Sequence, residues 1–412
     1  MKHSPHSLRG QVAVVGIGET TYYKHGASPD PEFKLVLKAI LAACADAGVD
    51  ARDIDGFASY SNDRSDPVRL ACALGTHRLR SSTMQWGGGG GGCCAAVANG
   101  AAAIHAGLAD CVVVYRGLAQ GQFGRFGQVS GQVGGQLSGQ PGGHTTVSGD
   151  MAYQMPYGVL APPQKFALRV QRYLHEHGIQ RAALRAIAMA SYHHAQANPR
   201  AVMYGKPLTE ERYDNSRWIV EPLKLFDCCL ENDGAAAVLL VSADRARELS
   251  QQPGAPKPAY LLGAAGGAEH RFGASPHNAP HYASANYASV AADLYRMAGL
   301  GPSDVGVVQA YENFTGGVIM ALAEHGFFKP EEANEFLTLS NLRAPDGQLP
   351  LNTSGGNLAE CYMHGFELVL EAVRQVRGSS TSPARRNDVA LVIGGPMVAP
   401  ASNLLLGSEA TL

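Results

Sequence analysis

Short apolar runs alternate along the chain with longer stretches in which apolar residues recur at every third or fourth position. Apolar runs of about four to eight residues that are bounded by turn formers predict buried strands. Such runs cover residues 11–18, 54–60, 109–117 and 238–241, and a further apolar segment over 260–265 begins the second half. Helices are predicted over residues 33–48, 93–106, 162–178, 181–198 and a segment that begins at 366. Strands that alternate with helices indicate an α/β fold with mostly parallel sheets covered by helices.

The second half of the chain repeats the order of elements in the first half. An Ala-Gly pair, an acidic-aliphatic pair and a tyrosine stand at positions 47, 53 and 60 and recur at 298, 304 and 311, a constant offset of 251. Residues 109–117 likewise resemble 387–395, at an offset of 278. A period of this length indicates a duplicated domain rather than a solenoid.

The proline-rich segment 252–258 divides the two copies. We therefore predict an N-terminal half over residues 10–257 and a C-terminal half over residues 258–412. Within the first half, residues 118–150 are rich in Gly, Gln and Ser. This composition predicts a flexible surface excursion from the fold, such as a lid.

Each half carries a glycine-rich loop directly before a helix. The loop of the first half is 87–92, six consecutive glycines, and that of the second half opens the stretch 351–366. Duplication should place both loops at one shared site, where the amides of the helix N-termini can stabilise anionic oxygen. The run 87–92 lacks the Gly-Lys-Ser/Thr ending of a phosphate-binding loop. We interpret it as a place of close backbone approach; the alternative is a flexible linker.

The stretch 351–366 is the richest in reactive groups, because it brings a carboxylate, a thiol, a phenol and an imidazole together at 360–364. Tyr362 and His364 are two positions apart, so on a regular helix they would point to different faces. If both serve one site, the backbone there must be irregular, which Gly365 allows. A glycine-bounded loop that leads into a helix is a common place for catalytic groups. The alternative is a structural tyrosine and histidine in an ordinary loop.

Composition narrows the class of protein. Of 412 residues, 45% are hydrophobic and 17% charged, and the net charge is −2, which gives no electrostatic reason to expect nucleic acid or an anionic membrane as a partner. No apolar run approaches the roughly 18 residues of a membrane-spanning helix, and residues 1–10 lack the apolar core of a signal peptide. The eight cysteines form no CxxC pair, so neither a zinc site nor a disulfide framework is indicated. We expect a cytoplasmic protein with reduced thiols.

The motif order resembles the thiolase superfamily, and most of all the sterol-carrier-protein-type thiolases and their lipid-transfer-protein-type relatives. The resemblance covers nearly the whole chain. It implies an α/β, duplicated thiolase fold, layered αβαβα, with two mixed, mostly parallel sheets. It rests on residues 14–18, 95–107 with 109–110, 198–199, 222–227 with 233–236, 311–314 and 352–356.

The nucleophile of thiolases does not carry over. In the family a cysteine stands fourteen residues before the isoleucine of the following helix; counting back from Ile104 gives Gly90. Cys93 and Cys94 lie about one helical turn further on, so their thiols should point elsewhere. Without the cysteine, acyl transfer through an enzyme thioester is lost. A glycine at this position should also open room for a bulkier substrate.

The other catalytic positions of thiolases are altered as well. Tyr362 stands where the family has its histidine, Tyr311 where it has Asn or His, and Val392 where it has a second cysteine. The sequence has tyrosines at two of these positions and a Tyr-x-His-Gly-Phe stretch at 362–366. In these features it most resembles the thiolase-like aldolases of steroid side-chain degradation. This resemblance implies retro-aldol cleavage of a β-hydroxyacyl-CoA to a ketone and a short acyl-CoA.

The resemblance also implies roles for residues. Tyr362 is expected to be the general base, alone or in a relay with His364, because a phenol of pKa near 10 needs help at neutral pH and His364 is the nearby group that titrates near 7. Tyr311 is expected to donate a proton to the enolate or to act as an oxyanion donor. Three further residues are expected to be structural: Asp233 in a turn, Glu312 at a strand end and Asn352 as an orienting residue of the loop.

As for partners, the resemblance implies an acyl-CoA substrate, a homodimer, and a small OB-fold partner protein that helps to hold the CoA ester. It implies neither a redox cofactor nor a metal. Two alternatives stay open: a thiolase or acyltransferase that uses a displaced cysteine, and a non-catalytic subunit that binds acyl-CoA.

Overall fold

The computed structural model describes residues 7–123, 151–269 and 281–412. The strands of the first half are β1 (Val12–Glu19), β2 (Tyr23–Lys24), β3 (Gly56–Tyr60), β4 (Ser81–Gln85), β5 (Cys111–Ala119), β6 (Trp218–Val220), β7 (Leu223–Lys224) and β8 (Asn232–Ser242). Those of the second half are β9 (Ala259–Gly267), β10 (Val307–Ala310), β11 (Val389–Ile393) and β12 (Ala401–Gly407). The predicted strands are therefore confirmed, with ends that differ by a few residues.

Helices follow the strands in both halves. The first half contains α1 (Glu32–Ala47), α2 (Pro67–Leu74), α3 (Cys93–His105), α4 (Gln120–Phe123), α6 (Met151–Gln154), α7 (Pro162–His177), α8 (Arg181–Ala195), α9 (Glu210–Asp214) and α10 (Ala243–Ser250). The second half contains α11 (Ala288–Ala298), α12 (Thr315–Glu324), α13 (Ala333–Phe336), α14 (Leu339–Leu342), α15 (Gly356–Ala359) and α16 (Phe366–Arg377). Among the described residues, no helix is both long and apolar enough to cross a bilayer.

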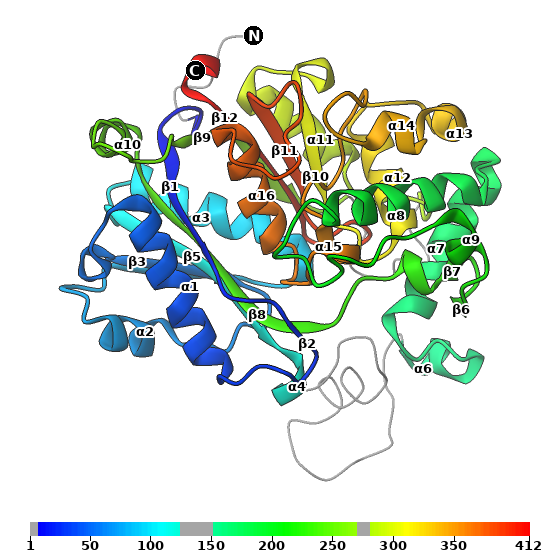
Figure 1. The fold of residues 1–412 in the computed structure, drawn as a ribbon, viewed down its shortest axis with the longest axis horizontal. Helices are drawn as coiled ribbons and strands as arrows, with labels where there is room; N and C mark the ends of the chain where they lie inside the picture. The colour runs from blue at the N-terminus through cyan, green and yellow to red at the C-terminus, as the bar shows by residue number, and fades with distance from the viewer. Residues whose placement is uncertain (1–6, 124–150, 270–280) are drawn as a thin grey trace.

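The sheets of the two halves are joined edge to edge. Ten strands form one sheet in the order β10-β11-β12-β9-β1-β8-β5-β3-β4, with β2 beside β8 (Figure 1). The expectation of two separate sheets was wrong, because the antiparallel pair of β1 and β9 joins the strands of both halves into one continuous sheet. Parallel pairing is found in the outer parts, where β3 pairs with β4 and β5, and β10 pairs with β11. The strands between them, from β5 through β8, β1, β9 and β12 to β11, pair antiparallel.

The duplication predicted from the 251-residue offset is confirmed. α1 and α11 both end at a left-handed glycine, Gly48 and Gly299, each with φ of 64°. β3 and β10 follow, and each pairs in parallel with the strand after the next long helix of its half, β5 and β11. The position of the boundary at residue 257 stays a prediction.

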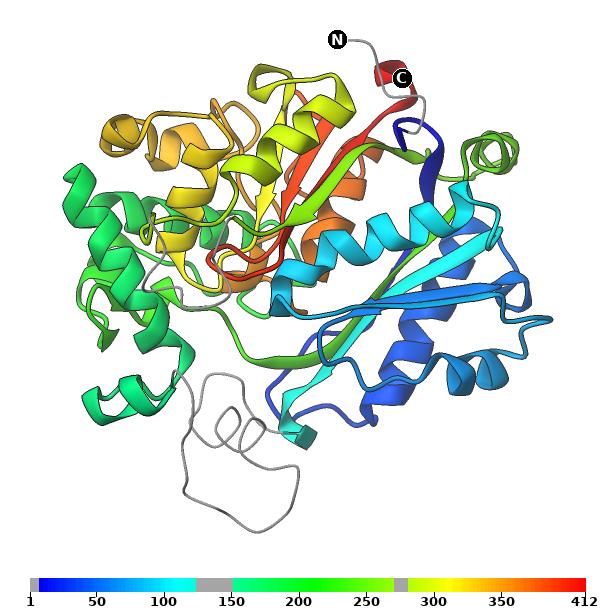
Figure 2. The same cartoon turned by 180° about the vertical axis from the view of Figure 1, so that it is seen from behind.

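Helices cover both faces of the sheet. α1 packs on β1, β5 and β8, and α11 packs on β9 and β12. α3 and α16 contact each other and the strands of both halves. They therefore form the central helical layer of the fold, between the strands of the two halves. Figures 1 and 2 show α1 and α3 on opposite faces of the first half, and α16 and α11 on opposite faces of the second. The first glycine-rich loop leads directly into α3. The glycines of the second, Gly355 and Gly356, lead into the short helix α15, so the expectation of a long helix directly after both loops is met only in the first half.

Two local predictions were wrong. Asp233 does not lie in a turn but within β8, which runs from Asn232 and is paired on both sides by β5 and by β1 and β2. Pairing on both edges overrides the turn preference of its Asp-Gly sequence. Its carboxylate accepts a hydrogen bond from the Gly121 amide at 3.0 Å. Leu118 and Ala119, placed in the excursion, complete β5; residues 124–150 of that excursion lie outside the described residues.

Candidate active site

The first glycine-rich loop contacts Tyr311 and the far end of the stretch 351–366, at His364. A Cβ built on Gly89 would lie 3.5 Å from Nε2 of His364, and one built on Gly90 would lie 2.3 Å from Cε2 of Tyr311. The loop before α3 therefore touches the residues that follow β10 and precede α16. The N-termini of both helices, at Cys93 and Phe366, open onto this point.

Tyr311 and Tyr362 form the centre of the site. Their hydroxyl oxygens are 2.7 Å apart, which is a direct hydrogen bond between two phenols. Each backbone is fixed by a bond of its own: the Tyr311 amide donates to the Ile393 carbonyl at 2.9 Å, and the Tyr362 amide donates to Oδ1 of Asn232 at 2.8 Å. Only 3% of Tyr311 and 7% of Tyr362 is exposed, so the pair lies almost out of solvent.

His364 joins the same site through an irregular backbone. Its ring centroid lies 5.8 Å from that of Tyr362 and 6.4 Å from that of Tyr311. His364 has φ of 60° and Gly365 has φ of 90°, so the chain leaves helical geometry here. This confirms that residues two apart can serve one site when Gly365 releases the backbone.

Burial sets the protonation of all three groups. Loss of solvent raises the pKa of Tyr311 and of Tyr362 above 10, and the nearby Cys229 raises both further. Burial, with the Arg116 cation, holds the pKa of His364 well below 6.5. The prediction that His364 titrates near 7 is therefore wrong, because sequence did not show its burial. At neutral pH the site holds two neutral phenols and a neutral imidazole.

The room expected beside Gly90 is already filled. A Cβ on Gly90 would lie 2.3 to 2.5 Å from Cε2, Cζ and the hydroxyl oxygen of Tyr311, and a Cβ on Gly365 would lie 2.6 Å from its Cδ2. The phenol ring is thus seated between two glycines. The expectation that Gly90 makes space for substrate is wrong, since this space holds the Tyr311 ring.

The cysteines near the site are enclosed in the core. Cys93 and Cys94 are fully buried, with their sulfurs 3.8 Å apart. The Cys94 thiol points to the Val392 carbonyl at 3.7 Å, and burial raises its pKa well above 9. Cys93 lies behind two glycines, since a Cβ on Gly365 or Gly394 would be 3.3 or 3.2 Å from its sulfur. Neither thiol occupies the position beside the phenols.

Two curated relatives match the chain over nearly its whole length. It is 37% identical to a protein of Mycobacterium tuberculosis named 17-hydroxy-3-oxo-4-pregnene-20-carboxyl-CoA lyase, over 97% of this chain and 100% of the relative. It is 37% identical to a steroid side-chain-cleaving aldolase of Thermomonospora curvata, over 98% of this chain and 99% of the relative. The chain belongs to the thiolase-like aldolases.

A solved structure and a domain family agree with this membership. Residues 268–407 of the aldolase match the family described as thiolase C-terminal domain-like. The structure called Ltp2-ChsH2(DUF35) aldolase superposes with a TM-score of 0.85 at 34% identity, over 98% of this chain and 99% of that chain. The thiolase fold implied by the motifs is confirmed.

Several residues of the aldolase site were not found from sequence. Glu367, in the first turn of α16, is buried, and burial raises its pKa well above 4.5. It accepts a hydrogen bond from the Asn357 amide and adds to the raised pKa of both phenols. Asn232 orients Tyr362 through its hydrogen bond to the Tyr362 amide, and Cys229 contributes to the raised pKa of both phenols. The sequence signal that could have found Asn232 and Glu367 is their position. Each is a polar residue close to a glycine, at the start of a strand or helix that leads to the site.

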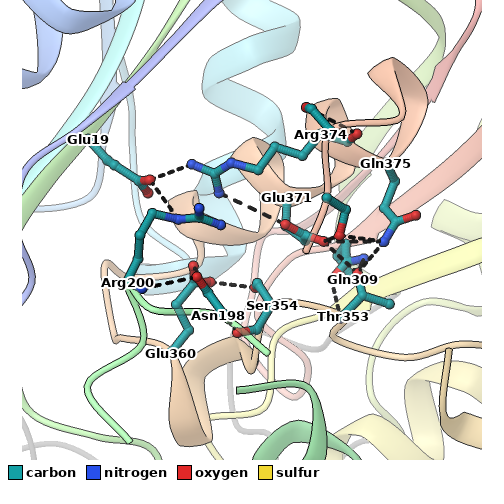
Figure 3. Close-up of polar contacts among 12 residues, drawn as sticks. Glu19, Asn198, Arg200, Gln309, Thr353, Ser354, Glu360, Glu371, Arg374 and Gln375 are labelled. Atoms are coloured by element: carbon teal, nitrogen blue, oxygen red, sulfur yellow. Dashed lines mark hydrogen bonds and ion pairs between the residues drawn. The ribbon is translucent and has the colours of Figure 1, made fainter. Parts of the chain in front are cut away.

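A polar network holds the first part of the stretch 351–366 (Figure 3). Asn352 exchanges two hydrogen bonds with the Ala310 backbone at 2.7 and 2.8 Å, which fits its expected orienting role. Thr353 donates to Glu371 at 2.7 Å and accepts from Gln309 and Gln375, both at 2.8 Å. The remaining contacts join Ser354 and Asn198 to Glu360, and Arg200 and Arg374 to Glu19.

Arg374 is the buried cation of this network, so its loss should destabilise the aldolase. It lies 2.5 Å from Glu19 and 3.9 Å from Glu371, which is fully buried. Arg374→Met removes the cation and leaves buried carboxylates partly uncompensated, which we expect to cost about 3 kcal/mol or more. Urea unfolding measures this. Arg245→Met is the matched control, because Arg245 pairs with Glu248 on the exposed surface and should change stability by less than about 1 kcal/mol. Equal small losses in both variants would contradict the structural role of Arg374.

Glu312, two residues beyond β10, should make stability depend on pH. It is fully buried, and burial raises its pKa from 4.5 to about 8. The folded chain keeps this proton up to about pH 8, whereas the unfolded chain releases it near 4.5, so the stabilisation is present below pH 4.5 and is lost as pH rises to 8. Glu312→Gln cannot titrate and should lack this loss. The free energy of unfolding of the wild type minus that of the variant should fall by about 3 to 5 kcal/mol between pH 4.5 and 8; parallel curves would show that Glu312 is ionised in the fold.

Proposed function

We propose that this aldolase cleaves the bond between the α- and β-carbons of a β-hydroxyacyl-CoA with a steroid-type acyl group, releasing a ketone and a short acyl-CoA. The observation that carries the proposal is the 2.7 Å bond between the phenols of Tyr311 and Tyr362. These residues replace groups that thiolases use, and the thiols of Cys93 and Cys94 are enclosed in the core. The names of the two relatives, a carboxyl-CoA lyase and a steroid side-chain-cleaving aldolase, support the same reaction and substrate class.

The phenol pair can move the single proton that the reaction requires. In retro-aldol cleavage the β-hydroxyl loses a proton, the carbon–carbon bond breaks with its electrons going to the thioester enolate, and the α-carbon then gains a proton. Tyr362 accepts the hydroxyl proton as its own proton passes to Tyr311 and the proton of Tyr311 passes to the α-carbon, so the three transfers occur together as the carbon–carbon bond breaks and neither phenol holds an extra proton. No phenolate needs to persist, which suits two phenols whose pKa values are raised by burial.

The surroundings of the pair favour the negative enolate. The positive ends of the α3 and α16 dipoles meet at the site, and they stabilise developing charge on the thioester oxygen. His364 places a neutral imidazole beside both rings. The cleavage is redox-neutral and its proton is handled by side chains, so we propose that it uses neither a redox cofactor nor a metal ion.

We propose two protein partners. The similar solved structure is named as an aldolase with a DUF35 chain, which supports a small OB-fold partner that helps to hold the CoA ester. A second copy of the chain is the other partner. β4 forms one edge of the sheet, and at this edge Met84 is 43% and Trp86 87% exposed, which a copy paired along that edge would cover.

A cytoplasmic location is supported by the eight free cysteines and the CoA thioester substrate.

The test of the reaction uses the purified chain together with any DUF35 protein encoded beside it. A steroid-type β-hydroxyacyl-CoA is supplied without free CoA, and mass spectrometry is used to find a ketone and a shortened acyl-CoA. We expect both products, because retro-aldol cleavage consumes no CoA. Products that form only with added CoA, and vanish in Cys93→Ser, would instead show a thiolase. Binding of the acyl-CoA with no cleavage under either condition would show a non-catalytic subunit.

A further inference from the structure

Tyr60 is the counterpart of Tyr311 in the first half of the chain, and it also reaches the site. It ends β3 as Tyr311 follows β10, and it is fully buried. Its hydroxyl donates to the backbone carbonyl of His364 at 2.9 Å. Its ring also stacks against the imidazole, with centroids 5.8 Å apart and planes 27° from parallel. Tyr60 therefore holds His364 at both its backbone and its side chain.

Arg116 on β5 fixes Tyr60 in turn. Its Nη1 donates to the Tyr60 carbonyl at 2.9 Å, and its guanidinium carbon lies 5.1 Å from the centroid of the tyrosine ring. Nη2 donates to Oδ1 of Asn62 at 2.9 Å, and the carboxylate of Asp63 is 3.5 Å away. Arg116 is 1% exposed, so it cannot swing into solvent. Tyr60 is thereby held at its backbone and at its ring face by a rigid, buried group.

The backbone at His364, which Tyr60 holds, has an unfavourable conformation that neighbouring groups must stabilise. A non-glycine residue with positive φ costs about 1 kcal/mol or more and persists only where neighbours enforce it. His364 has φ of 60°, and Gly365 after it has φ of 90°. The carbonyl of His364 belongs to the peptide between these two residues. If that peptide relaxed, both the imidazole and the preceding Tyr362 would move relative to Tyr311.

We propose that Tyr60 is a positioning residue for the cleavage reaction: its hydroxyl and ring fix His364 and, through the intervening residue, the hydroxyl of Tyr362. The duplication has thus produced two equivalent tyrosines with different roles, Tyr311 in the reaction and Tyr60 behind it. The inference rests on the proposed function for its kinetic test, but its structural part can be measured without activity.

The experiment compares Tyr60→Phe with Tyr115→Phe. Both replacements keep the ring and remove one buried hydroxyl, since that of Tyr115 donates to the Ser65 carbonyl at 2.7 Å on the opposite face of the sheet. We expect kcat to fall about 10- to 100-fold in Tyr60→Phe, with KM within about twofold, because the reacting groups are misplaced rather than removed. Tyr115→Phe should keep the wild-type kcat. A kcat in Tyr60→Phe equal to that of Tyr115→Phe would overturn the proposal.

Hydrogen exchange of the same variants separates this inference from the proposed function. Amides of residues 361–366 should exchange faster in Tyr60→Phe than in the wild type, and at the wild-type rate in Tyr115→Phe. Unchanged exchange in Tyr60→Phe would overturn the positioning role whether or not the wild type cleaves the substrate. A wild type that shows no cleavage, together with faster exchange in Tyr60→Phe, would refute the proposed reaction while leaving Tyr60 as the residue that holds the loop.

Discussion

Tyr362→Phe should lower kcat for cleavage by about 1,000-fold, within the range of 10²- to 10⁴-fold that general acid–base groups contribute. Phenylalanine keeps the buried ring but removes the oxygen that accepts the substrate proton and that lies 2.7 Å from the Tyr311 hydroxyl. Stability and the Kd for the acyl-CoA should change little, because the ring packing is retained. Steady-state kinetics gives kcat, and calorimetric titration with the inert variant gives the Kd.

The control for Tyr362→Phe is Tyr295→Phe, far from the phenol pair. The Tyr295 hydroxyl donates to the His325 carbonyl at 3.0 Å, so its removal also costs a hydrogen bond, which is partly buried. It should leave kcat unchanged. Full activity in Tyr362→Phe would remove the central residue of the proposed mechanism. Inactivity accompanied by loss of acyl-CoA binding would assign Tyr362 to binding instead.

Much of the fold could be predicted from the sequence because the duplication leaves a repeated pattern of residues in the two halves. The repeated Ala-Gly turn, acidic-aliphatic pair and tyrosine give the register between the halves, and that register aligns Tyr60 with Tyr311. The expected pairing of Tyr311, Tyr362 and His364 in one site is what the structure shows. Strands of weak pattern were missed: β4 alternates half-buried and exposed polar residues at an edge, and β12 was not distinguished from a loop.

The chemistry of the site was less predictable, because it depends on contacts between segments far apart in the chain. Burial, which no local pattern shows, moves the pKa of His364 away from 7 and gives two neutral phenols. Glu367 and Asn232 act on the phenols from α16 and β8, and only the packing of these elements brings them close. Glycine at position 90 was read as open space, but the residue that uses the space is 221 positions later, since 311 minus 90 is 221.

Gly90→Ala should lower kcat by about 100-fold without disrupting the fold. The added methyl would lie 2.3 to 2.5 Å from three atoms of the Tyr311 ring, which is too close for any real contact, so the ring must shift. A displacement of about 1 Å at reacting groups can cost about 100-fold in rate, and it would break the phenol–phenol hydrogen bond. Gly90 does not have positive φ, so alanine fits its backbone and the effect is steric.

The matched control for Gly90→Ala is Gly100→Ala within α3. There the new methyl would meet Leu240, Val112 and Val114 side chains at 3.0 to 3.3 Å, a milder crowding of the core that does not involve Tyr311. Gly100→Ala should reduce stability modestly and keep kcat. Wild-type kcat in Gly90→Ala would mean that Tyr311 does not need its present position to react. A loss of kcat in Gly90→Ala would show that a side chain at position 90, including the cysteine of thiolases, and the ring of Tyr311 cannot occupy the same volume. In this fold, thiolase and aldolase chemistry would then exclude each other through a single steric contact, with the loss of the nucleophile and the gain of the tyrosine being one structural change.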